Sequence, residues 1–170
     1  AMSQPVVTVN GKEAGKWAYG YNAFRIDITP FIQFGKSNLI EVHLNNVEES
    51  SRWYPGGGLY RPVSVELYGN ENFSTWDTFV RTLKADKQEA EVEVNALLEG
   101  KAGKSGKTVI ALFDEAGKKV AEQTVSGATS QIKTTLKVAN PQLWSPESPY
   151  LYQVKLTRYE GKKVADVQTL

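Results

Sequence analysis

The stretch Ala90-Glu91-Val92-Glu93-Val94-Asn95-Ala96 alternates apolar residues with acidic or amide residues. In an extended chain, a period of two places successive side chains on opposite faces, so that one face packs on a core and the other meets water. The stretch therefore predicts a β-strand in a sheet that is buried on one side.

The same alternation recurs along the rest of the chain. Apolar residues or threonine occupy every second position in five further runs, which are Phe24–Ile28, Ile40–Leu44, Val63–Leu67, Ile132–Val138 and Tyr152–Leu156. Each run predicts a strand with one buried and one solvent-facing side. The segment Thr108–Phe113 is apolar on both faces, which favours a strand in the middle of a sheet.

Turn-forming residues separate these runs. Asn10-Gly11 follows the apolar stretch Val6–Val9 and predicts a type I′ hairpin, because both central residues of that turn need positive φ angles. Glu115-Ala116-Gly117 predicts a second tight hairpin. Helical pattern is confined to one short turn, with Thr29 as the expected N-cap and Pro30 as the first helical residue. Short strands joined by turns indicate an all-β protein.

A polar break at Gly69-Asn70-Glu71-Asn72 divides the chain into two predicted domains, residues 1–69 and residues 70–170. The second domain has seven candidate strands, which begin near Phe73, Glu89, Thr108, Lys119, Ser130, Leu151 and Val164. That number fits an immunoglobulin-like sandwich. The first domain has four or five candidate strands, too few to close a two-sheet sandwich alone. We expect its unpaired strand edges to favour a homo-oligomer.

Composition excludes several kinds of chemistry. The 170 residues contain no cysteine, and His43 is the single histidine, so disulfides, Cys/His zinc sites and cysteine nucleophiles are ruled out. The net charge of +1 gives no reason to expect a nucleic acid or a membrane as partner. His43 falls on the polar face of its predicted strand, so we expect an exposed, hydrogen-bonded side chain rather than a base or a ligand. No cofactor and no metal are expected.

One loop carries more information than the strand pattern. It reads Ser51-Arg52-Trp53-Tyr54-Pro55-Gly56-Gly57-Gly58-Leu59-Tyr60-Arg61-Pro62-Val63, with three glycines among aromatic and arginine residues. Aromatic faces and arginine donors are suited to a ring-shaped polar ligand such as a sugar. The alternative is structural, with the aromatic side chains packed under the loop and Arg61 paired with a nearby carboxylate.

A second loop is Leu143-Trp144-Ser145-Pro146-Glu147-Ser148-Pro149-Tyr150-Leu151-Tyr152. Its two prolines favour an extended, non-helical segment. We expect Trp144 and Tyr150 to attach this loop to an edge of the sandwich, which is a structural role.

Taken together, these motifs resemble those of glycoside hydrolase family 2. Val9-Asn10-Gly11-Lys12, Tyr19-Gly20-Tyr21 and the segment Phe24–Phe31 resemble its sugar-binding jelly-roll domain, and the glycine loop is similar to the W-Y-P-G-x-G-I-Y-R signature that closes that domain. The proline loop is similar to the L-W-x-P-x-x-P-x-L-Y signature of the immunoglobulin-like domain that follows. The resemblance implies an all-β chain of two β-sandwich domains, a partial galactose-binding-like jelly roll and then an immunoglobulin-like sandwich. Within the family, the resemblance is strongest to bacterial β-galactosidases.

The resemblance also implies what this segment does. Family members hydrolyse glycosides with two glutamates on a (β/α)₈ barrel after the immunoglobulin-like domain, so we expect no catalytic residue here and no glycosidase activity from the 170 residues alone. Arg61, Tyr54, Trp53 and Tyr60 match the family loop that borders the substrate entrance. By analogy, the parent enzyme would act on a β-galactoside or related glycan in the periplasm or cell envelope.

Other interpretations stay open. A free-standing carbohydrate-binding module would use the same aromatic loop without a barrel, and a purely structural immunoglobulin-like module would use every aromatic for packing. A local carboxylate pair would need Glu48-Glu49 or the row Glu89, Glu91 and Glu93. Adjacent residues on an extended chain point to opposite sides, and we interpret the row on one strand face as a solvated surface.

Overall fold

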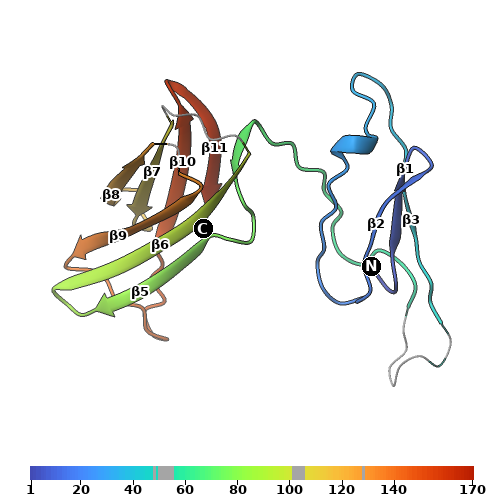
Figure 1. Ribbon diagram of the computed structural model, residues 1–170. Coiled ribbons are helices and arrows are strands. Elements are labelled where there is room, and N and C mark those ends of the chain that lie inside the picture. The colour runs from blue at the N-terminus through green and yellow to red at the C-terminus, as the bar shows by residue number, and fades with distance from the viewer. Residues whose placement is uncertain (48, 50–55, 101–105, 128) are drawn as a thin grey trace. The chain divides into compact units, whose positions relative to one another are not determined.

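The computed structural model describes residues 1–47, 49, 56–100, 106–127 and 129–170. The chain divides into two compact units, an N-terminal unit, Ala1–Val65, and a C-terminal unit, Glu66–Leu170. Both are built from antiparallel strands, which confirms the all-β prediction (Figure 1). No helix in the described ranges is long and apolar enough to cross a membrane.

The N-terminal unit contains one three-stranded sheet of order β2-β1-β3. Its strands are β1 (Val6–Val9), β2 (Lys12–Lys16) and β3 (Ile40–His43). Asn10 and Gly11 between β1 and β2 have φ angles of 52° and 76°, as a type I′ turn requires, so the hairpin prediction is confirmed. The Asn10 side chain also binds the segment before β3, because its amide donates to Asn38 Oδ1 at 2.8 Å and its oxygen accepts from Leu39 N at 3.1 Å.

The short helical turn starts one residue earlier than expected. It is a 3₁₀ turn over Thr29–Phe31 with Ile28 at the N-cap, so the prediction that Thr29 caps it is wrong. No side chain caps the turn from the N-cap position, and the Thr29 N–H donates instead to Asp27 Oδ1 at 2.9 Å. Hydrogen bonds from Thr29 hold the pKa of Asp27 below its usual range.

Two predicted strands, Phe24–Ile28 and Val63–Leu67, do not form. Neither segment has a strand partner among the described residues, and Ile28 at the end of the first is already in the helical region, with φ −97° and ψ −1°. In Phe24–Ile28 the apolar residues are still half-buried and the polar ones exposed, so the alternation orients side chains without making a ladder. In Val63–Leu67 the apolar side chains face solvent, and Leu67 is 90% exposed. Alternation selects a face, but a strand also needs backbone partners.

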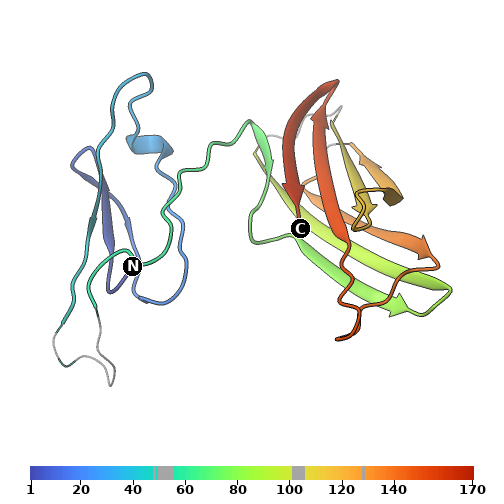
Figure 2. The ribbon, with the colours of Figure 1, turned by 180° about the vertical axis from the view of Figure 1, so that it is seen from behind.

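The C-terminal unit is a sandwich of two antiparallel sheets, visible as two layers in Figure 1 and from behind in Figure 2. One sheet has the order β11-β10-β7-β8, and in the other β6 pairs with β4 and β5 along one edge and with β9 along the other. The bounds are β4 (Glu71–Phe73), β5 (Phe79–Ala85), β6 (Glu89–Gly100), β7 (Gly106–Phe113), β8 (Lys119–Ser126), β9 (Gln131–Ala139), β10 (Gln153–Glu160) and β11 (Lys163–Thr169).

Most of the strand predictions for this unit are confirmed. The stretch Ala90–Ala96 lies in β6, and Thr108–Phe113 lies in β7, which has a strand on each side as its apolar faces predicted. The single strand expected near Phe73 is two strands instead, because a turn over residues 75–77 separates β4 from β5. Ser74 Oγ donates to the Asp77 carboxylate in that turn.

The core lies between the two sheets. Val94, Ile132 and Leu136 from one sheet and Ile110 and Leu156 from the other are fully buried. Four of these residues come from the alternating runs of the sequence and Ile110 comes from the run that is apolar on both faces, so the sequence pattern identifies this part of the core.

A buried ion pair attaches β4 to the opposite sheet. Arg158 Nε on β10 lies 2.7 Å from Glu71 Oε2 on β4, and both side chains are essentially inaccessible to solvent. Gly106 provides the room, since an added Cβ there would overlap the Arg158 guanidinium. The Phe73 N–H donates to Asp166 Oδ2 of β11 at 2.8 Å. β4 is therefore tied to β6 by its ladder and to β10 and β11 by side chains.

Candidate functional site

The glycine loop is the strongest sequence candidate, and its second half is described from Gly56 onward. Trp53 and Tyr54, two of the four predicted site residues, lie outside the described residues. Gly58 forms a pair of backbone hydrogen bonds with Met2, at 3.1 and 3.3 Å, and has a φ angle of 139°. A side chain at position 58 would be strained at that angle, so glycine allows the chain to pair closely with Met2.

Tyr60 and Arg61 are brought together as predicted neighbours. The Tyr60 hydroxyl donates to the carbonyl oxygen of Gly20 at 2.8 Å, while its side chain remains 53% exposed. The Arg61 guanidinium carbon lies 5.6 Å from the centre of the Tyr60 ring, in a cation–π arrangement. Tyr60 is thus anchored by its polar end with part of its surface open.

Tyr19 and Tyr21 belong to the same place and were not identified as site residues from the sequence. They flank Gly20, the residue that Tyr60 binds, and their ring centres are 5.6 Å apart. Both are about half exposed. Gly20 itself is buried, and a Cβ there would overlap the Met2 sulfur. The Tyr-Gly-Tyr spacing was the available signal, because two tyrosines around a glycine can face solvent together when the glycine is packed inward.

We name this group the tyrosine cluster, consisting of Tyr19, Tyr21, Tyr60 and Arg61. Part-exposed phenol rings offer apolar faces and hydroxyls, and a guanidinium offers several fixed donors. Among the described residues, no ion pair or further hydrogen bond is recorded for Arg61. The alternative that Arg61 pairs with a nearby carboxylate therefore finds no partner in that part of the chain.

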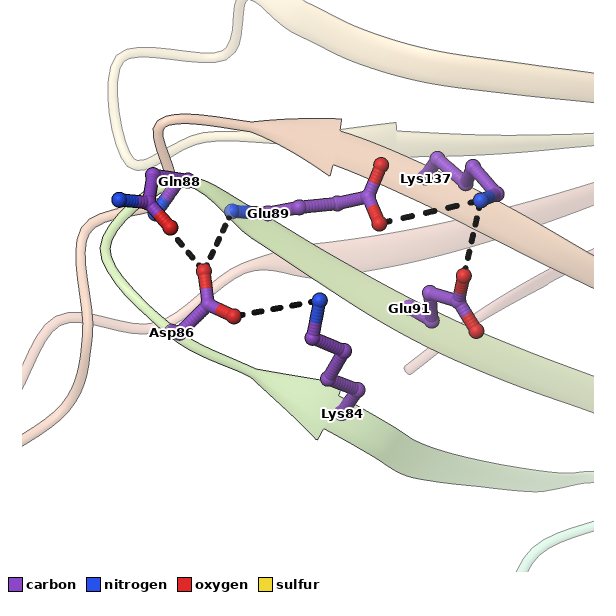
Figure 3. Close-up of polar contacts among 6 residues, drawn as sticks. All are labelled: Lys84, Asp86, Gln88, Glu89, Glu91 and Lys137. Atoms are coloured by element: carbon purple, nitrogen blue, oxygen red, sulfur yellow. Dashed lines mark hydrogen bonds and ion pairs between the residues drawn. The ribbon is translucent and has the colours of Figure 1, made fainter.

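The acidic row on β6 is paired with basic residues. Lys137 Nζ on β9 lies 2.8 Å from Glu91 Oε1 and 3.8 Å from Glu89 Oε1 (Figure 3). At the β5–β6 turn, Asp86 accepts hydrogen bonds from the N–H groups of Gln88 and Glu89, both at 2.9 Å, and lies 3.2 Å from Lys84 Nζ (Figure 3). This part of the row is a cross-strand charge ladder.

Glu93 departs from the interpretation of this row as a solvated surface. It is 7% exposed, and its carboxylate lies 2.9 Å from Arg81 Nη2 and 3.2 Å from Lys133 Nζ. Hydrogen bonds from Asn95 and Lys133 lower the pKa of Glu93, and the hydrogen bond and charge of Lys137 lower the pKa of Glu91. A general acid needs a raised pKa to hold its proton near neutral pH, so these carboxylates are suited to structure and not to acid catalysis.

Two further sequence candidates are His43 and the Glu48-Glu49 pair. His43 is exposed at the end of β3, as expected from its polar strand face. Glu48, one half of the Glu48-Glu49 pair, is outside the described residues. Within the described ranges, no group of three or more His, Asp or Glu side chains is placed to hold a metal ion.

The proline loop is attached by tyrosines, and the expectation for Trp144 is wrong. The Tyr150 hydroxyl accepts from Glu115 N at 3.3 Å and the Tyr152 hydroxyl from Gln142 N at 2.9 Å, while Trp144 is 60% exposed. Trp144 lines a cleft of about 490 Å³ with apolar walls from β5, β6 and β10. The hydroxyls can hold the loop because each reaches a backbone N–H.

Comparison with known proteins identifies the family. The model of glycosyl hydrolases family 2 matches residues 73–170, which is more than half of the chain. The chain belongs to glycosyl hydrolase family 2. A structure of a family 2 member from Bacteroides cellulosilyticus superposes on 99% of this chain with a TM-score of 0.90 and 34% sequence identity, and the match spans 24% of that protein.

Two curated relatives extend the similarity over both units. A Formosa agariphila protein with a provisional β-glucuronidase name is 38% identical over 164 residues, covering 96% of this chain and 16% of its own length. The β-galactosidase BoGH2A of Bacteroides ovatus is 33% identical over 154 residues, covering 86% of this chain and 18% of its own. This family 2 chain therefore spans less than a fifth of the length of these relatives.

Proposed function

We propose that this chain is a non-catalytic part of a family 2 glycosidase, related to β-galactosidases and β-glucuronidases, that borders the substrate entrance. In this proposal the N-terminal unit is a partial jelly roll that presents the tyrosine cluster to the sugar. The C-terminal unit is an immunoglobulin-like spacer that supports a catalytic barrel elsewhere in the enzyme. Hydrolysis belongs to that barrel.

The observation that carries the proposal is the anchoring of Tyr60. Its hydroxyl is fixed on the Gly20 carbonyl, and half of the side chain remains exposed beside Arg61. A side chain held by its polar end and open along its ring can contact a sugar without first losing conformational freedom. The contact would position the substrate and would take no part in bond cleavage.

The test uses the enzyme that contains this chain together with its barrel. Arg61→Met and Tyr60→Phe should each lower kcat/KM on nitrophenyl β-glycosides, by about tenfold for Arg61→Met if one charge-assisted contact is lost. Phe34→Ala is the matched control, because Phe34 lies in the same unit, is 79% exposed and makes no aromatic contact with the cluster. Its kcat/KM should equal that of the wild type. Equal kcat/KM in all four proteins would refute the entrance role and favour a purely structural module.

A free-standing carbohydrate-binding module is the second candidate, favoured by the exposure of Tyr19 and Tyr21 and of Tyr60, which binds the Gly20 carbonyl between them. Such a module would bind sugar without the catalytic barrel. Calorimetric titration of residues 1–170 with methyl β-galactoside separates the two. Measurable heat of binding at millimolar ligand supports the module, and its absence supports an entrance site completed by the barrel.

A further inference from the structure

Asn10-Gly11 is the single Asn-Gly dipeptide in the sequence, and it forms the turn between β1 and β2. Asparagine followed by glycine is especially prone to deamidation, because glycine has no side chain to hinder attack by its own backbone nitrogen. Gly11 is exposed, and a Cβ there would meet nothing within 4 Å. The reactive dipeptide therefore lies at an open turn, where the surrounding chain does not crowd Gly11.

The side chain of Asn10, by contrast, is held at both of its polar atoms. Its Nδ2 donates to the carbonyl oxygen of Phe31 at 2.9 Å and to Asn38 Oδ1 at 2.8 Å, and its Oδ1 accepts from the N–H of Leu39 at 3.1 Å. Both N–H bonds of the amide are thus used. The group that would react is also the group that joins the hairpin to the 3₁₀ turn and to the segment before β3.

The chemistry of deamidation requires these contacts to break. The Gly11 nitrogen attacks Asn10 Cγ to form a five-membered succinimide ring, and the side-chain nitrogen leaves as ammonia with the proton of the Gly11 N–H. Water then adds to one of the two ring carbonyls and breaks its bond to the Gly11 nitrogen, which gives aspartate or isoaspartate. Because Nδ2 is the leaving atom, its hydrogen bonds to Phe31 and Asn38 are lost on the way.

We propose that Asn10 is a deamidation site which the fold protects, and that its reaction irreversibly loosens the N-terminal unit. The product carboxylate has no N–H to donate, so the Phe31 carbonyl and Asn38 Oδ1 each lose a donor and face a negative charge. Isoaspartate also adds a methylene to the backbone of a turn whose φ angles are 52° and 76°. Either product releases the hairpin from the segment before β3. This inference is independent of the proposed entrance role.

The first measurement compares the rate of reaction at Asn10 in the folded 170-residue chain and in the same chain unfolded in guanidinium chloride, at one mildly alkaline pH and one temperature. Trypsin releases residues 1–12, in which Asn10 is the sole asparagine. Mass spectrometry with fragmentation then follows conversion of its amide to a carboxyl group. We expect Asn10 to react at least about tenfold more slowly in the folded chain. Equal rates would overturn the protection.

Substitutions at Asn38 test the mechanism without changing the dipeptide. Asn38→Ala removes one acceptor of Asn10 Nδ2 and should raise the rate in the folded chain by about fivefold. Asn38→Asp keeps an oxygen acceptor opposite the amide, so its rate should stay closer to that of the wild type. Asn22→Ala is the matched control, because it removes an exposed asparagine of the same unit that takes no part in these bonds. Equal rates in Asn38→Ala and Asn22→Ala would contradict the mechanism.

Asn10→Asp measures the consequence of the reaction. It should keep the bond from the Leu39 N–H, because a carboxylate oxygen also accepts, and should lose the two bonds that Asn10 Nδ2 donates. We expect amide hydrogen exchange in β1–β3 to become about tenfold faster. Asn22→Asp is the control, since it adds the same charge at an exposed position of the same unit. Unchanged exchange in Asn10→Asp, or an equal increase in Asn22→Asp, would show that deamidation does not loosen the unit.

Discussion

The two units share one sequence pattern and differ in what the pattern achieves. In the C-terminal unit, alternating residues from both sheets become a continuous buried core. In the N-terminal unit, the same pattern gives one sheet in which Val7 and Val9 are the buried apolar strand residues among those described. A period of two determines which side chains share a face, but burial requires a second layer opposite that face.

The central strands of the two units also differ in length. β6 spans Glu89–Gly100 and pairs along both edges, whereas β1 spans four residues and supports the whole N-terminal sheet. An apolar side chain is therefore expected to contribute differently to the free energy of unfolding in the two units, and substitutions can measure that difference.

The largest effect is expected from breaking the buried ion pair. Arg158→Met would leave the Glu71 carboxylate buried without its cation, so we expect a loss of about 3–5 kcal/mol in the free energy of unfolding of the C-terminal unit. Urea unfolding followed by circular dichroism measures it. Lys119→Ala is the control, because it removes an exposed ion pair at 2.6 Å and should cost at most about 1 kcal/mol. Equal losses in the two variants would mean that Glu71 is rehydrated in the folded state.

Leucine substitutions compare a buried position of the pattern with an exposed one. Leu156→Ala removes a fully buried side chain and should cost about 2–5 kcal/mol. Leu67→Ala, at a position 90% exposed in an equally regular run, should change stability by no more than about 0.5 kcal/mol. Urea midpoints of the two variants give the comparison. A loss above about 2 kcal/mol for Leu67→Ala would show that the Val63–Leu67 segment is packed after all.

Matched turn substitutions place the same strain in each unit. Gly11 and Gly117 have φ angles of 76° and 75°, and a Cβ at either would meet open space. Gly11→Ala and Gly117→Ala should therefore each cost about 1 kcal/mol from backbone strain alone. Amide hydrogen exchange on the full chain measures the two units separately. If the protection lost in each variant is confined to its own unit, the units unfold independently, and loss in both would show that they unfold together.

The smallest effect concerns the charge ladder. Because the folded pKa of Glu91 lies below its ordinary value of 4.5, its stabilisation is complete above that pH and is lost as pH falls through the lowered pKa. The pKa of Lys137 is raised above its ordinary value of 10.5. The contribution of its charge to stability is therefore present below that pH and is lost as pH rises further. The stability difference between wild type and Glu91→Gln should be constant from about pH 5 to 9 and shrink below pH 4. A difference that grows on acidification would contradict the ladder.

Much of the C-terminal fold can be predicted from the sequence, because local pattern and tertiary packing agree there. Ala90–Ala96 and Thr108–Phe113 became β6 and β7 with their expected faces. The Glu71–Arg158 pair could not be predicted, since its members are 87 positions apart and nothing local marks either as buried. The burial of Glu93 depends likewise on Arg81 and Lys133 from neighbouring strands.

The candidate site was predictable only in part. The composition of the glycine loop identified Tyr60 and Arg61, which the fold places side by side. Tyr19 and Tyr21 join them through one hydrogen bond across 40 positions, from Tyr60 to Gly20, which no local pattern encodes. The strands expected at Phe24–Ile28 and Val63–Leu67 do not form for a related reason. Whether a segment finds a partner strand depends on the whole fold and not on its own sequence.

The attachment of β4 has a mechanical consequence. β4 is the first strand of the C-terminal unit, so tension arriving along the chain from residues 66–70 acts on it before any other strand. A strand held only by one ladder can be peeled away bond by bond. Here the load is shared, because the β6 ladder, the Glu71–Arg158 contact and the Phe73–Asp166 hydrogen bond lead to three different strands. Glu71–Phe73 thus acts as a clamp at the point where force enters the sandwich.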